Sequence, residues 1–165
     1  MYIYIVEQLK EQHEQSNVLR IEAGKEMKYL IETDQKLDEE LLGSEDKVYE
    51  VIDGSLHMSG NAFAVFNNIP VVEEGRELFE ERFQARARKI ESEPGFVAIR
   101  VCRPLNSDTY MVLTLWDTED DFETWRQSNA YQHAHEKRKT SEGIDVQKPQ
   151  IFPRPSYVEK YHITE

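Results

Sequence analysis

Histidines are the residues of this chain that could most readily hold a metal ion or move a proton. The five are His13, His57, His133, His135 and His162. His133 and His135 are two positions apart, so on a helix they would point to nearly opposite sides and could not chelate one metal ion together. At most one of the two faces a pocket. Taken alone, either is more typical of a surface histidine on an amphipathic helix.

Trp125 and the pair Asn67 and Asn68 are further candidates, each with a structural explanation of its own. A lone tryptophan is typical of a core, and asparagine in a strand is typical of an edge or a bulge. The single cysteine, Cys102, excludes an intramolecular disulfide and a cysteine-rich metal site. The sequence contains no Ser-His-Asp order, phosphate-binding loop, dinucleotide-binding loop or His-Glu-x-x-His motif, so those reaction classes have no support.

The charge of the chain argues against two classes of partner. Its 165 residues carry a formal net charge of −12 at pH 7, and such an acidic surface repels nucleic-acid backbones and anionic lipids. No run reaches the 18 apolar residues of a spanning helix, and Met1–Val6 lacks the basic flank and cleavage site of a secretory signal. We therefore expect a cytoplasmic protein that binds neither nucleic acid nor membrane.

The first sixty residues are expected to form a strand-rich extension. Near-alternating runs of β-branched and aromatic residues predict four strands, at Met1–Val6, Val18–Glu22, Met27–Glu32 and Lys47–Ile52. Acidic loops join them, and no cluster of titratable groups marks an active site there. Residues 1–60 are therefore interpreted as a scaffold or interface extension to a domain spanning residues 61–165.

Residues 61–165 predict the order β-α-β-β-α-β. Strands are expected at 62–69, 96–102, 110–116 and 157–163. An amphipathic helix is expected from Glu74 to Glu91, with acids early and bases late, and a second helix is expected to begin at a capping box of Thr118 and Asp121. A further short helix would end near Lys137. This order is typical of a ferredoxin-like α+β fold, whose antiparallel sheet carries its helices on one face.

The hairpin at residues 96–116 is largely apolar on both faces, which has a consequence for assembly. The helices cover one face, and a soluble protein rarely leaves the other exposed. A second sheet packed against it would come from a two-fold partner, or from the first sixty residues of the same chain. Because the N-terminal strands are polar and broken by acidic loops, we expect a homodimer.

Six segments of the chain form a recognisable combination. They are Phe66–Ile69, Gly75–Phe83, Glu93–Phe96, Leu113–Trp116, Phe122–Trp125 and Ala130–His135. Together they resemble the antibiotic-biosynthesis-monooxygenase (ABM) domain, and more closely the haem-degrading monooxygenases of Gram-positive bacteria in the longer, two-part form of bacilli. The resemblance covers the second hundred residues well and the first sixty loosely, chiefly at Val48–Asp53.

The resemblance implies an active site of three residues: an asparagine on the first strand of the domain, a tryptophan after the hairpin, and a histidine ten residues beyond it. These map to Asn68, Trp125 and His135, with Asn67 the second choice and His133 a bystander. His135 would be the axial ligand of the haem iron. Asn68 would hydrogen-bond iron-bound oxygen, and Trp125 would press on and distort the macrocycle.

The resemblance also implies the reaction. Haem would be both substrate and cofactor, and O2 with an external electron donor, a reductase or a small reductant, would oxygenate a meso carbon, open the porphyrin and release iron. Candidate cations for the haem propionates are Arg82, Arg86, Arg88 and Arg138. Two alternatives stay open: a cofactor-free quinol or polyketide monooxygenase on the same fold, and a regulatory or stress-signalling protein of the same architecture.

Overall fold

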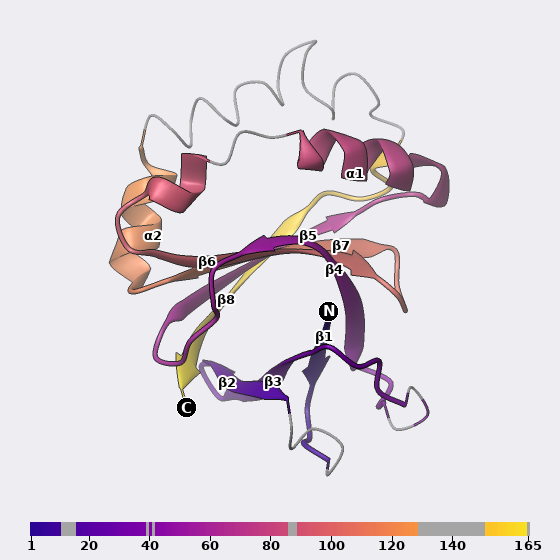
Figure 1. Ribbon diagram of the computed structural model, residues 1–165, viewed down its shortest axis with the longest axis horizontal. Coiled ribbons are helices and arrows are strands. Elements are labelled where there is room, and N and C mark those ends of the chain that lie inside the picture. The colour runs from indigo at the N-terminus through magenta and orange to yellow at the C-terminus, as the bar shows by residue number, and fades with distance from the viewer. Residues whose placement is uncertain (11–15, 39, 41, 86–88, 129–150, 165) are drawn as a thin grey trace.

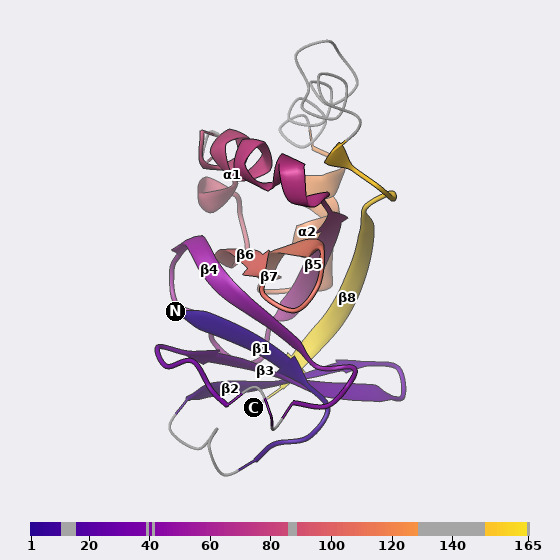
Figure 2. The same ribbon diagram turned by 90° about the vertical axis from the view of Figure 1, so that its right-hand side faces the viewer.

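Antiparallel strands close into a barrel, with the helices on the outside of one half of it (Figure 1, Figure 2). The computed structural model describes residues 1–10, 16–38, 40, 42–85, 89–128 and 151–164. The strands are β1 (Tyr2–Val6), β2 (Asn17–Ala23), β3 (Glu26–Thr33), β4 (Lys47–Ser55), β5 (Phe63–Pro70), β6 (Phe96–Pro104), β7 (Thr109–Trp116) and β8 (Tyr157–Thr164), and the α-helices are α1 (Arg76–Gln84) and α2 (Glu119–Arg126). Around the barrel the order is β1-β3-β2-β8-β5-β7-β6-β4, and β4 pairs with β1.

The second half of the chain has the predicted ferredoxin-like order, β5-α1-β6-β7-α2-β8. Thr118 caps α2 as expected, its hydroxyl oxygen accepting a hydrogen bond from the backbone N–H of Asp121 at 3.1 Å. Helix α1 is shorter than the predicted Glu74–Glu91: Glu73–Gly75 forms a separate 3-10 turn before it, and Lys89–Ser92 forms another after it. The predicted helix ending near Lys137 lies outside the described residues, and within them no helix is long and apolar enough to cross a membrane.

The four predicted N-terminal strands are also confirmed, and they close the barrel. Strand β4 pairs with β6, where Tyr49 lies opposite Pro104. Strand β2 pairs with β8, where Ile21 lies opposite Ile163. Two strand pairings therefore join the first half of the chain to the second.

The inside of the barrel is an apolar core built from both halves. Ile3, Ile21 and Leu30 from the N-terminal strands pack in one cluster with Phe66 and Leu113. The premise of the predicted dimer, an open sheet face, is therefore wrong. Side chains alternate between the two faces of a strand, so strands that look polar overall still direct an apolar row inward.

One buried ion pair crosses this interior. The Nε of Arg100 on β6 lies 2.6 Å from Oε2 of Glu32 on β3, and each residue is 8% exposed. A second guanidinium nitrogen donates to the carbonyl oxygens of Ser55 at 3.0 Å and Ile99 at 2.8 Å. A Cβ atom on Gly54 would lie 2.9 Å from the Arg100 side chain, so the glycine leaves room for it. The pair links two strands that are not neighbours in the barrel.

Because the inner face is covered within one chain, we expect the purified protein to be monomeric. Light scattering coupled to size-exclusion chromatography at micromolar concentration should give a mass near 19.4 kDa. A mass near twice that value would show that a surface other than the inner sheet face joins two chains.

Candidate functional site

The outer face of the sheet β8-β5-β7-β6 carries the helices and is the candidate site. Strand β5 pairs with β7 without a bulge over its whole length, so its side chains alternate strictly between the two faces. Phe63, Val65 and Ile69 lie in the clusters that include residues of α1 and α2. Asn67 has the same parity and therefore also points outward.

Trp125 lies in the last turn of α2 and is half-buried against this outer face. Its ring lies 5.4 Å from that of Trp116, at an interplanar angle of 31°, and 6.2 Å from that of Phe122. The cluster also includes Phe63 and Val65. Aromatic packing thus fixes the indole beside the strand that carries Asn67.

Asn67 is partly exposed and stands among apolar residues. Its register neighbours are Val112 on β7 and Val158 on β8, and Val158 is 53% exposed. Within the described part of the chain, the Asn67 amide has no hydrogen-bond partner. A free amide donor and acceptor above an apolar surface can orient a ligand that rests on that surface.

The structure corrects the expectation that Asn68 shares a site with Trp125. Asn68 is 4% exposed and points into the barrel, away from α2. Its Nδ2 atom donates hydrogen bonds to Oε1 of Glu159 at 2.8 Å and to the carbonyl oxygen of Phe66 at 3.4 Å. Asn68 and Trp125 thus lie on opposite faces of one sheet.

The spacing of residues in the sequence does not show that Asn68 and Trp125 lie on opposite faces of the sheet. Asn68 was chosen over Asn67 because it lies seven residues before Gly75, and a count along the chain carries no information on side-chain direction. The signal that could have decided is parity, since Asn67 alternates in phase with Phe63 and Val65. That signal is readable only once the face covered by the helices is known.

Of the other predicted site residues, only Arg82 lies within the described part of the chain. His133 and His135 lie outside the described residues, as do Arg86, Arg88 and Arg138, whereas Arg82 lies in α1. Within the described ranges, no group of three or more His, Cys, Asp or Glu could hold a metal ion. Cys102 is buried inside the barrel, and burial raises the pKa of its thiol well above the ordinary value.

Charged contacts fix α1 against the end of β6. The Arg103 guanidinium on β6 binds both carboxylate oxygens of Glu80, at 2.6 and 2.9 Å, and Oε1 of Glu50 at 2.6 Å. The Tyr110 hydroxyl also donates to Glu80, and the Phe79 ring lies 4.7 Å from that of Tyr110. The hydrogen bonds from Arg103 lower the pKa of Glu80, against the opposing effect of burial.

The beginning of α1 is held by close packing. A Cβ atom at Gly75 would lie 2.4 Å from the Cβ of Ile151, so only glycine fits there. The backbone N–H of Val72 donates to the carbonyl oxygen of Ile151 at 2.8 Å. The segment before β8 is thereby tied to the start of α1, which sets one wall of the outer face.

Comparison with known proteins identifies the family and supports the fold. The sequence profile described as antibiotic biosynthesis monooxygenase matches residues 62–137. The chain is 35% identical over 83 residues to a haem-degrading monooxygenase of Halalkalibacterium halodurans, covering 48% of this chain and 71% of that protein. It is 42% identical over 84 residues to a staphylobilin-producing haem oxygenase of Staphylococcus haemolyticus, covering 48% and 79%.

Solved structures match over nearly the whole chain. A major regulator of staphylococcal pathogenesis has a TM-score of 0.76 at 18% identity, covering 98% of both chains. The haem-degrading enzyme LmHde of Listeria monocytogenes has a TM-score of 0.67 at 17% identity, covering 98% of this chain and 99% of that one. At such identities they establish the fold alone, which is the ferredoxin-like α+β class with an N-terminal extension. With the sequence matches, the chain belongs to the antibiotic biosynthesis monooxygenase family.

The Glu80 contact predicts a specific pH dependence of stability. Because folding lowers the Glu80 pKa, its contribution is complete above the ordinary carboxyl pKa and is lost as pH falls through the lowered value. Glu80→Gln should reduce the free energy of unfolding by about 1–2 kcal/mol at neutral pH, and by less in acid. Urea titrations at several pH values measure this. Glu81→Gln, on the exposed side of α1, is the control, and equal losses in both variants would contradict the assignment.

Proposed function

We propose that this chain is a haem-degrading monooxygenase and that haem binds on the outer sheet face between α1 and α2. The proposed reaction uses O2 and an external electron donor to oxygenate a meso carbon, open the ring and release iron. The observation that carries the proposal is the placement of Asn67 and Trp125 on one face, in a chain whose relatives of 35% and 42% identity are named as haem-degrading enzymes.

The described residues of this face suit a flat, largely apolar molecule. Val112 and Val158 form an apolar surface beside Asn67, and Val158 is exposed enough to be covered by a ligand. Trp125 packs with Phe63 and Val65 on the same face, at the α2 side, where its indole would limit how a ring can lie. Bound haem supplies the iron centre at which dioxygen is activated.

The roles of the polar residues follow from this placement. Asn67 replaces Asn68 as the amide that would orient a polar group at bound haem, because it shares the face of Trp125. His135 remains the proposed axial ligand, since it follows Trp125 by ten residues and neutral imidazole is a standard ligand of haem iron. Arg82, Arg86, Arg88 and Arg138 remain the candidate cations for the propionates.

Axial ligation is tested by titrating the protein with haemin. The wild-type chain should give a Soret band that saturates at one haem per chain. His135→Ala should abolish the Soret shift, whereas His133→Ala should leave it nearly unchanged. Indistinguishable spectra for the two variants would refute the assignment of His135.

The role of Asn67 is tested against its neighbour. Asn67→Ala should bind haem within a few-fold of the wild-type affinity. With ascorbate under air, it should bleach haem at least roughly tenfold more slowly. A contact that matters mainly during the reaction affects turnover more than affinity. Asn68→Ala should keep most of the bleaching rate, because its side chain lies inside the barrel. Circular dichroism checks that both variants fold. Loss of bleaching in Asn68→Ala alone would return the role to Asn68.

A further inference from the structure

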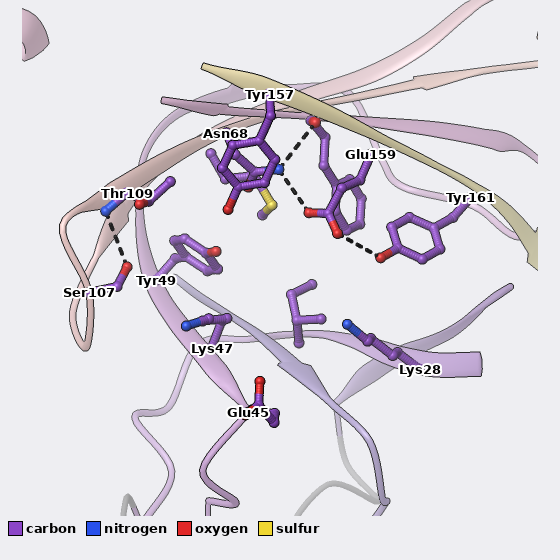
Figure 3. Close-up of a pocket in the computed structure, with 13 residues that line it drawn as sticks. Lys28, Glu45, Lys47, Tyr49, Asn68, Ser107, Thr109, Tyr157, Glu159 and Tyr161 are labelled. Atoms are coloured by element: carbon purple, nitrogen blue, oxygen red, sulfur yellow. Dashed lines mark hydrogen bonds between the residues drawn. The ribbon is translucent and has the colours of Figure 1, made fainter. Parts of the chain in front are cut away.

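A cavity of about 160 Å³ opens inside the barrel, on the sheet face opposite the proposed haem site (Figure 3). Both halves of the chain line it. Ile5, Phe66 and Met111 belong to the apolar core beneath it. Lys28, Glu45, Lys47, Tyr49, Asn68, Ser107, Thr109, Tyr157, Glu159 and Tyr161 surround the remaining space. An apolar floor with polar groups directed above it is the usual construction of a small-molecule site.

Tyr49 is the most informative of these residues. It is 4% exposed, and Figure 3 shows its hydroxyl directed into the cavity. Among the residues that the structure describes, this hydroxyl has no hydrogen-bond partner. Burial, with the nearby Cys102, Tyr157 and Glu159, raises the pKa of Tyr49, so the group is a neutral donor at neutral pH. The hydroxyl faces the open space of the cavity, so it can donate a hydrogen bond to a ligand there without first breaking one to the protein.

Glu159 provides a fixed acceptor in the same space. Its Oε1 accepts from Asn68 at 2.8 Å and its Oε2 accepts from the Tyr161 hydroxyl at 3.1 Å. A carboxylate accepts about four hydrogen bonds, so each oxygen can take another. Asn68 is thus a positioning residue that holds Glu159 in place.

Two lysines from the N-terminal strands line the cavity; Figure 3 shows the Lys28 amine directed toward its centre, and Lys47 is an exposed residue. Lys28 is already paired with Glu26 at 3.0 Å. Lys47 has no ion pair with any described residue, and the nearby acids are Glu45 on the rim and Glu159, whose oxygens face Asn68 and Tyr161. In a chain of net charge −12, an unpaired amine beside a free hydroxyl donor favours an anionic group at this point.

The volume sets the size of the ligand. A cavity of about 150 Å³ holds one benzene ring, so this one accommodates a single ring and excludes a porphyrin.

We propose that the barrel cavity binds a single-ring aromatic carboxylate that carries a hydroxyl group. Its carboxylate would meet Tyr49 and Lys47, its ring would rest on Phe66 and Met111, and its hydroxyl would donate to Glu159. This site is independent of the proposed haem chemistry.

The test uses the full chain and 4-hydroxybenzoate as probe, followed by isothermal titration calorimetry. Saturable binding is expected, with a Kd of roughly 0.1–1 mM for so small a ligand. Tyr49→Phe and Lys47→Met should each weaken it about tenfold, since each removes a hydrogen bond to a charged group. Tyr29→Phe and Lys25→Met, which alter residues that do not line the cavity, are matched controls and should bind as wild type does.

Tyr49→Phe should leave the thermal midpoint unchanged, because the removed hydroxyl has no described protein partner. If that variant fails to fold, Lys47→Met decides alone. Absence of saturable binding up to about 10 mM would overturn the proposal. So would equal affinity for 4-hydroxybenzylamine, which carries the opposite charge on the same ring. Competition between the probe and haemin would place the probe on the outer face and would also overturn it, without bearing on haem degradation itself.

Discussion

Closure of the barrel within one chain is the constraint on which the rest of this structure depends. The sheet β8-β5-β7-β6 is apolar on both faces, so helices alone leave half of it uncovered. The N-terminal strands cover the inner face and connect through the pairings β4 with β6 and β2 with β8. The Arg100–Glu32 pair crosses the interior, where loss of one partner would leave a buried charge and cost about 3–5 kcal/mol.

Closure gives the two faces of one sheet different chemistry. The outer face bears the helices, the partly exposed Asn67 and the indole of Trp125, whereas the inner face is sealed except at the cavity that contains Tyr49 and Glu159. Adjacent asparagines on β5 belong to different environments because strand side chains alternate. The β5–β7 register has no bulge, so Asn67 and Asn68 cannot exchange faces without a slip of the whole strand.

Local signals made most of the elements predictable from the sequence. Alternation located the strands, and the Thr118 capping box located the start of α2. Closure was not predictable in the same way, because pairings such as Ile21 with Ile163 join residues far apart in the chain and leave no local pattern. The inner cavity was missed for the same reason, since Lys28, Tyr49 and Glu159 come from three different strands. The face of Asn67 could be assigned only after the helices were placed.

The first sixty residues also determine what covers the inner face of the sheet that carries the candidate site. The sequence matches to the two relatives cover 48% of this chain, and the family profile begins at residue 62, after all four N-terminal strands. A second chain covering the inner face would make folding depend on protein concentration, whereas strands of the same chain provide the cover at a fixed effective concentration. The N-terminal strands of the same chain therefore cover the inner face of the sheet that positions Asn67. The geometry of that sheet does not depend on a partner chain covering its inner face.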